Sequence, residues 1–222
     1  MRLETSLLLG AALVALAAGQ ASAAAAVYDA PPTLAGDQGY SGILGDDFTV
    51  NSAVTVTALG AFDSGKTGIT TDIMIGLYDL TTAAYVTPVV NFNGTPDPTN
   101  AAFVFQAITP VHLIAGHNYS IVGMGFNGVD RNYNTNTDTP LRNGTSPVTF
   151  NTLYGALTND FSRYAGADPS GSVVFPYASA FGAGTLVAYV PEPAAWALML
   201  IGIGGVGVAL RGRRQLALAR AV

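Results

Sequence analysis

Carboxylates are the most numerous side chains in this sequence that could take part in chemistry. Asp63 and Asp72 lie among Gly, Ser and Thr residues typical of loops, and Asp46, Asp47 and Asp79 lie close to other predicted turns. Loops bind Ca²⁺ through carboxylate and carbonyl oxygens. We therefore treat Asp63 and Asp72 as a candidate calcium site, and the sequence predicts no other cofactor.

Other catalytic or metal-binding groups are scarce. His112 and His117 are the only histidines, and a zinc site would need both on one face together with a third ligand. Cysteine is absent, which excludes thiolate-bound zinc and thiol nucleophiles. The sequence has no Gly-x-Ser-x-Gly motif, which would position a nucleophilic serine, and no pair of acidic residues at a spacing typical of acid–base catalysis. It therefore predicts no catalytic residue and a protein that is not an enzyme, with a hydrolase as the less favoured alternative.

Residues Gly60 to Thr67 match the G-x-x-x-x-G-K-[ST] pattern of a phosphate-binding loop. Such a loop needs a helix that begins at the Lys-Thr pair, because the helix N-terminus holds the phosphate. Here Gly68 follows and then a predicted strand, and Asp63 would place a negative charge in the cradle. We therefore interpret this stretch as a loop between strands.

A long polar segment runs from Asn127 to Pro147 and is rich in Asn, Thr, Asp and Gly. It is too polar to supply core and too long for a hairpin turn. Within it, Asn132, Tyr133 and Asn134 combine amides with an aromatic ring, the groups that sugar-binding surfaces use. These three residues are the candidate ligand loop, although tyrosines at the corners of a β-sandwich core are the simpler interpretation.

The scaffold for these residues is predicted to be made of strands. Short β-branched or aromatic segments alternate with turn residues, and no 3.6-residue apolar period lies between them. This pattern predicts an all-β fold, an antiparallel β-sandwich or jelly roll. The predicted strands are Phe48–Val50, Val54–Leu59, Ile73–Tyr78, Val86–Phe92, Ala102–Gln106, Val111–Leu113, Tyr119–Phe126, Val148–Leu153, Val173–Phe175 and Leu186–Tyr189.

The N-terminus has the pattern of a secretory signal peptide. Arg2 precedes an apolar run from Leu7 to Ala18, and Ala21 and Ala23 form an A-x-A cleavage site. We therefore expect export through the Sec translocon and cleavage by signal peptidase. The next segment, 24–42, is rich in Ala, Pro and Gly and is predicted to be a tether or an edge segment.

The C-terminus has the pattern of a short membrane anchor. Ala194 to Leu210 contains seventeen residues without a charge, which as a helix would span roughly 26 Å of a hydrocarbon core of about 30 Å. Trp196 suits the headgroup layer at one end, and the basic residues at the other end should stay in the cytoplasm. The basic residues are Arg211, Arg213 and Arg214.

Pro191 and Pro193 flank Glu192 just before this run. Proline fixes φ and lacks an N–H donor, so this tetrad should be an extended, unpaired peptide outside the bilayer that a processing enzyme can grip. The predicted segments are a signal peptide at 1–23, a tether at 24–42, a β-sandwich ectodomain at 43–189, a sorting segment at 190–214 with its membrane helix at 194–210, and a cytoplasmic tail at 215–222.

The run Pro191-Glu192-Pro193-Ala194-Ala195-Trp196-Ala197, followed by a Gly-rich apolar stretch and the arginines, resembles the PEP-CTERM sorting signal in its PEP-x-x-W-A variant. The resemblance implies that exosortase, a membrane-embedded enzyme, recognises the segment and cleaves near the tetrad. It further implies a transient stay in the inner membrane and release to the cell surface or to an exopolysaccharide matrix.

Residues from Gly39 to Gly128 also resemble a β-sandwich ectodomain often found upstream of that signal. The resemblance rests on four segments: Phe48–Val50, Val54–Asp63, Gly76–Asp79 and Leu113–Tyr119. It implies an extracellular, non-enzymatic domain. Related ectodomains often carry a longer Asp/Asn-Gly run at the Asp63 loop, and Lys66 departs from that pattern.

Charge narrows the partners further. The segment from Ala24 to Val190 contains twelve aspartates and four basic residues, so its net charge is −8. Such a domain repels phosphate backbones, so nucleic acid is not an expected partner. We expect an exported, non-enzymatic surface or matrix protein with a structural or adhesive role in an exopolysaccharide layer. The alternative is a carbohydrate- or calcium-binding, lectin-like module.

Overall fold

A computed structural model describes residues 23–96, 101–134, 147–166, 168–171, 173–175 and 181–191. The chain divides into two compact units, and the described residues up to Val190 all belong to the unit Ala23–Val190. The predicted signal helix and the predicted membrane helix at 194–210 lie outside the described residues. Within the described part, no helix is long and apolar enough to cross a membrane.

The described strands pair in antiparallel fashion, which confirms the all-β prediction. One sheet has the order β1 (Ala25–Ala26), β15 (Gly184–Tyr189), β4 (Val54–Phe62) and β8 (Phe103–Leu113). A larger sheet has the order β13 (Val173–Phe175), β12 (Leu157–Ala165), β3 (Ile43–Val50), β9 (Asn118–Met124), β5 (Met74–Asp79) and β6 (Ala84–Tyr85), with β7 (Val90–Asn91) also paired to β5. Two small ladders join β2 (Tyr28–Asp29) to β11 (Thr149–Phe150) and β10 (Tyr133–Asn134) to β14 (Phe181–Gly182). A 3₁₀ turn covers Pro169–Gly171.

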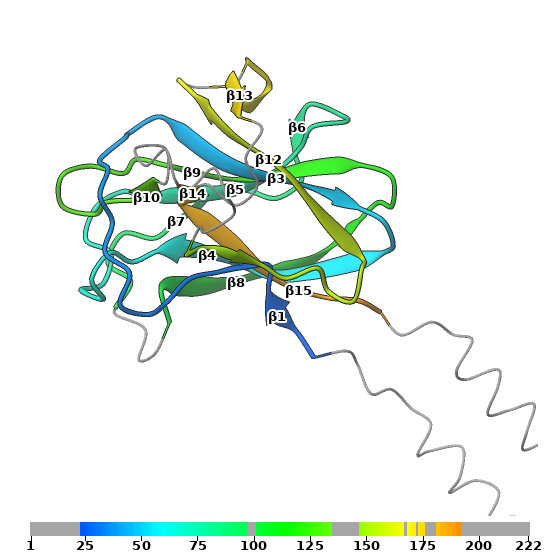
Figure 1. Cartoon of the computed structure of the whole chain (residues 1–222), viewed down its shortest axis with the longest axis horizontal. Coiled ribbons are helices and arrows are strands. Elements are labelled where there is room, and N and C mark those ends of the chain that lie inside the picture. Colours follow the sequence, from blue (N-terminus) through cyan, green and yellow to red (C-terminus); the bar gives the residue numbers. More distant parts are fainter. Residues whose placement is uncertain are drawn as a thin grey trace, which may run out of the picture. The chain divides into compact units, whose positions relative to one another are not determined.

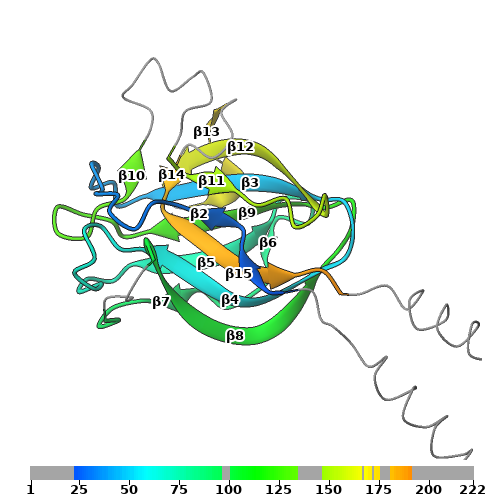
Figure 2. The same cartoon turned by 60° about the horizontal axis from the view of Figure 1, so that its bottom comes forward.

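The two larger sheets lie face to face in a sandwich-like arrangement (Figures 1 and 2). The chain changes sheet in passing from β3 to β4, from β4 to β5, from β7 to β8 and from β8 to β9, so these four connections carry it from one sheet to the other. Side chains alternate along a strand, and the inward set is fully buried, including Ile75 and Leu77 on β5. On β4 the register shift after Val56 brings Leu59 to the inward face, and both side chains are fully buried. Each such side chain contributes about 1.5–3 kcal/mol of burial free energy.

Several strand predictions need correction, and the predicted strand Val148–Leu153 is a strand only at Thr149–Phe150. Strand β12 was not predicted, because its polar residues conceal the alternation and a register shift falls between Asn159 and Ser162. The predicted strand Val86–Phe92 is a strand only at Val90–Asn91. The two segments predicted at Ala102–Gln106 and Val111–Leu113 form one continuous strand, β8, with an irregularity opposite Thr57.

Residues 25–30, the first part of the predicted tether 24–42, are built into the fold. Strand β1 pairs Ala25 with Ala188 and forms the edge beyond β15. The Val27 amide then donates to the Leu186 carbonyl at 2.9 Å, and the Tyr28 side chain is completely buried. Burial of these apolar groups explains why a segment rich in Ala and Gly is ordered. Of the two predicted possibilities, the edge segment describes residues 25–30.

Candidate functional site

The Asp63 carboxylate closes the turn that comes after β4. It is 2% exposed and accepts the amide hydrogens of Thr67 at 3.1 Å and Gly68 at 3.0 Å. Lys66 and Gly68 have positive φ angles of 59° and 77°, which turn the chain back on itself. The phosphate-loop pattern is therefore a tight turn whose amides bind the chain's own carboxylate. A calcium ion at Asp63 would have to replace these two bonds.

Asp72 lies in a separate exposed environment. Its Oδ1 accepts hydrogen bonds from the side-chain amides of Asn91 at 3.0 Å and Asn93 at 3.1 Å, and these bonds lower the pKa of Asp72. Among the residues that the structure describes, no group of three or more His, Cys, Asp or Glu side chains could hold a metal ion. The calcium prediction for Asp63 and Asp72 thus gains no support from a third acid.

The candidate ligand loop is turned toward the protein. Asn132 is fully buried, and its Nδ2 donates to Gln38 Oε1 at 3.2 Å. The Asn134 amide donates to Asp37 Oδ1 at 2.8 Å, and Tyr133 pairs with Gly182. The predicted ligand residues Asn132, Tyr133 and Asn134 therefore fasten the N-terminal segment and β14 to the body of the domain.

Asp130, in the same loop, is a structural residue that the sequence did not reveal. Its Oδ2 accepts four hydrogen bonds, from the amides and the hydroxyls of both Thr70 and Thr71, at 2.6–3.3 Å. The side chain is buried. Asn127 supports the turn by accepting the Asp130 amide at 3.1 Å. This carboxylate joins two loops at one end of the sandwich.

The two histidines have different partners. His117 Nδ1 lies 2.8 Å from Asp79 Oδ2, and the other oxygen of that buried carboxylate accepts the amides of Thr81 and Thr82. His112, which is exposed on β8, instead lies with Nδ1 2.8 Å from Thr55 Oγ1. Each imidazole is thus engaged with its own neighbour.

The Asp79 bonds predict a pH dependence of stability. Burial raises the pKa of this carboxyl, but the bonds from His117, Thr81 and Thr82 outweigh burial and leave the pKa below the ordinary 3.8. A depressed carboxyl pKa stabilises the fold above pH 3.8 and loses that contribution as pH falls through the folded-state pKa. Urea unfolding between pH 7 and pH 2 should show this acid loss, and it should be smaller in Asp79→Asn. Equal acid losses in both proteins would contradict the assignment.

A buried polar cluster lies between β3 and β12. Arg163 binds Asp47 through two nitrogens, with Nε 2.6 Å from Oδ1 and Nη2 on Oδ2, and its Nη1 donates to the Pro169 carbonyl at 3.1 Å. On the neighbouring position, Ser162 Oγ donates to Asp46 Oδ1 at 2.9 Å. Burial raises the pKa of Asp47, while the guanidinium acts to lower it. Asp46 and Asp47 were also considered as calcium ligands, but their carboxylates bind Ser162 and Arg163 within the fold.

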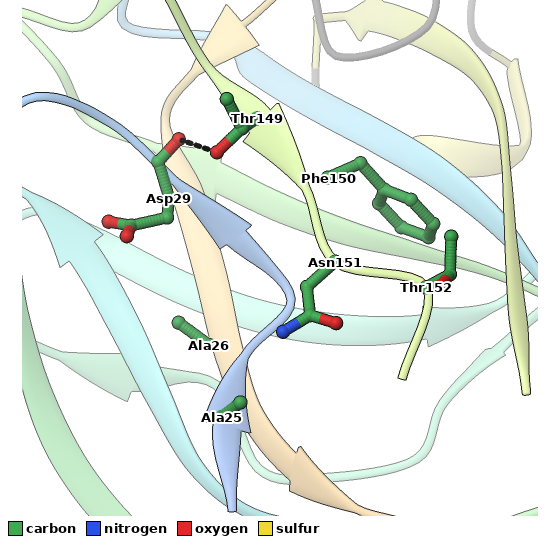
Figure 3. Close-up of a pocket in the computed structure, with 7 residues that line it drawn as sticks. All are labelled: Ala25, Ala26, Asp29, Thr149, Phe150, Asn151 and Thr152. Atoms are coloured by element: carbon green, nitrogen blue, oxygen red, sulfur yellow. Dashed lines mark hydrogen bonds between the residues drawn. The ribbon is translucent and has the colours of Figure 1, made fainter. Parts of the chain in front are cut away.

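An open depression of about 480 Å³ lies beside β2 and the segment that comes after β11 (Figure 3). It is lined by Ala25, Ala26, Asp29, Thr149, Phe150, Asn151 and Thr152. The Thr149 hydroxyl donates to the Asp29 carbonyl at 3.3 Å and holds the two walls together. No residue of this depression belonged to the predicted ligand loop.

The last strand of the domain ends close to the predicted sorting segment. Strand β15 ends at Tyr189, and the exposed Pro191 comes two residues later. Residues 190–214 match the PEP-CTERM protein-sorting motif. The chain carries a PEP-CTERM sorting motif. This confirms the sequence-based recognition, with a β-rich domain upstream of the motif. No curated protein matches the chain.

The PEP-CTERM motif implies an exported protein that exosortase recognises and processes at the membrane. Of the predicted processing residues, Pro191 and Ala23 are described, and both are exposed. The other predicted processing residues lie outside the described part: Ala21, Glu192, Pro193, Trp196, Arg211, Arg213 and Arg214. The motif therefore begins where the folded domain ends.

Proposed function

We propose that this chain is a non-enzymatic cell-surface or extracellular-matrix protein with a structural or adhesive role in an exopolysaccharide layer. The observation that carries the proposal is the PEP-CTERM motif at residues 190–214, which begins directly after β15. In this proposal the Sec translocon exports the chain, signal peptidase cleaves after Ala23, and residues 194–210 hold it briefly in the inner membrane. Exosortase then cleaves near Glu192 and releases the domain to the surface.

The bonding of the acids supports a non-enzymatic role. Asp63, Asp79 and Asp130 are buried, and each accepts two or more hydrogen bonds from groups of the protein itself. A general acid or base must instead reach a substrate proton. These carboxylates stabilise turns and loops through their hydrogen bonds, and their burial keeps them from a substrate.

Replacement of Glu192 tests the sorting proposal. We expect wild-type cells that possess exosortase to contain a shortened chain at the surface or in the matrix. Glu192→Ala should leave a longer chain in the membrane fraction, because the enzyme loses the acid between the two prolines. Fractionation with intact-mass determination of the mature protein reports both cleavage sites.

Arg220→Ala is the matched control, because Arg220 lies beyond the matched motif and should leave processing unchanged. An intact wild-type chain that stays in the membrane fraction of exosortase-containing cells would overturn the sorting proposal.

A further inference from the structure

We infer that the depression beside β2 and β11 binds a neutral hexose polysaccharide. This deepens the matrix role and rests on it for its biological setting. The depression is open, and its exposed polar side chains are Asp29, Thr149, Asn151 and Thr152. Sugar chains present many hydroxyl groups along an extended surface, so an open polar depression suits them better than a closed apolar cavity does.

Asp29 and Asn151 each keep one polar group for a ligand. Asp29 Oδ1 accepts the Ala30 amide at 2.8 Å, and Asn151 Oδ1 accepts the Leu153 amide at 2.9 Å. These bonds fix both side chains, while Asp29 Oδ2 and Asn151 Nδ2 have no protein partner among the described residues. A carboxylate oxygen accepts from a hydroxyl, and an amide nitrogen donates to one. Together they match the donor and acceptor sides of sugar hydroxyls.

Tyr154 adds an aromatic ring two positions beyond Thr152. Leu153, Tyr154 and Gly155 have consecutive positive φ angles of 46°, 60° and 86°. Leu153 is buried and anchors the turn, whereas Tyr154 is 87% exposed. Positive φ is unfavourable for residues other than glycine, and such strain gathers at functional sites. The turn presents the Tyr154 ring to solvent close in sequence to the lining residues, and a pyranose ring can stack on such an aromatic face.

The ring of Phe150, by contrast, serves the fold. It packs against the buried Tyr28 with ring centroids 5.2 Å apart. Tyr28 and Phe150 are partners in the β2–β11 ladder, and Asp29 pairs with Thr149 one step along. Neighbouring positions of a strand face opposite sides, so the carboxylate side of the ladder is the polar one.

The negative charge of the site and of the domain disfavours an acidic sugar polymer. Asp29 is the only charged residue lining the depression within the described part of the chain. The segment from Ala24 to Val190 also carries a net charge of −8. Uronic acid or sulfated polymers would be repelled by both, while hydroxyl groups bind without a charge penalty.

Affinity electrophoresis of the purified full-length chain in detergent tests the inference. Gels containing dextran, laminarin or galactomannan supply neutral polymers, and gels containing alginate or chitosan supply acidic and cationic ones. We expect at least one neutral polymer to retard the protein. Asp29→Asn and Asn151→Asp should each weaken retardation about tenfold, because each keeps its Oδ1 bond and alters only the free group.

Tyr154→Gly separates binding from folding. Glycine relieves the left-handed backbone, so the thermal midpoint should not fall, while neutral-polymer binding should weaken about tenfold or more. Asp72→Asn and Val129→Ala are the controls, since both side chains are exposed and lie outside the depression. Both should bind as wild type does.

Three results would overturn the inference: no retardation by any neutral polymer, retardation by alginate or chitosan alone, or unchanged retardation in all three variants. Failure here with normal surface sorting would leave the matrix proposal standing. Normal binding by a chain that is never released would instead contradict the sorting proposal.

Discussion

Arg163→Ala should lower the free energy of unfolding by about 3–5 kcal/mol, the usual cost of removing one partner from a buried ion pair. Both side chains are nearly inaccessible, with exposed fractions of 9% for Arg163 and 4% for Asp47. The variant would leave the Asp47 carboxylate buried without its cation. It would also remove the donor to the Pro169 carbonyl.

The loss should depend on pH in a defined direction. Burial already raises the pKa of Asp47 above its ordinary 3.8 in spite of Arg163. A raised carboxyl pKa costs stability above the unfolded-state value, and that cost disappears as pH falls below it. The destabilisation by Arg163→Ala should therefore be largest near neutral pH and smaller below pH 4.

Urea unfolding of wild type, Arg163→Ala and the double variant Asp47→Leu with Arg163→Met measures this effect. The double variant removes both charges together, so it should recover much of the lost stability. Surface ion pairs contribute less than about 1 kcal/mol to the free energy of unfolding. A loss this small for Arg163→Ala would show that water solvates Asp47.

Gly125→Ala should lower the free energy of unfolding by about 3 kcal/mol, through a strained backbone and a steric clash. Gly125 has a φ of +91°, and a Cβ there would lie 2.2 Å from the Asp72 carbonyl oxygen. Its amide donates to the Ser41 carbonyl at 3.0 Å, so the position cannot shift freely. This glycine lets the loops around Asp72 and Asp130 pack closely.

Gly94→Ala is the matched control. Gly94 also has a positive φ, +76°, but a Cβ there would meet nothing within 4 Å. Gly94→Ala should lower the free energy of unfolding only by the cost of placing alanine at a positive φ, about 1 kcal/mol. Chemical denaturation measures both variants, and equal losses would show that the clash at Gly125 is relieved by movement of the Asp72 loop.

The sequence predicted strands well where β-branched and apolar residues dominate, as in β4 and β5. It missed β12 because Asp160 and Arg163 have the character of loop residues until their partners on β3 are known. The burial of the N-terminal segment could not be predicted for a similar reason. Val27 and Tyr28 become core residues only because their amides bind residues of β15. Local pattern predicts an element, but a polar strand depends on distant partners.

The candidate sites show the same limit. Asp63 and Asn132 have the residue types of ligand-binding groups, and their partners turned out to be the chain's own amides and Gln38. The depression at Asp29 and Asn151 joins residues more than 100 positions apart, which no local motif could bring together. The PEP-CTERM motif could be identified from the sequence because its defining residues are consecutive in the chain.

The pairing of β15 has a mechanical consequence for any force that is applied at the C-terminal end of the domain. Six residues of β15 are paired with β4 in antiparallel register, and β1 covers the other edge of β15. Tension entering through Val190 and leaving through the far loops would run along β15, so these hydrogen bonds would be loaded together in shear. A pull between the two chain ends would instead peel β1 away one pair at a time. The pairing therefore resists force between Val190 and the far loops much better than force between the two ends of the domain.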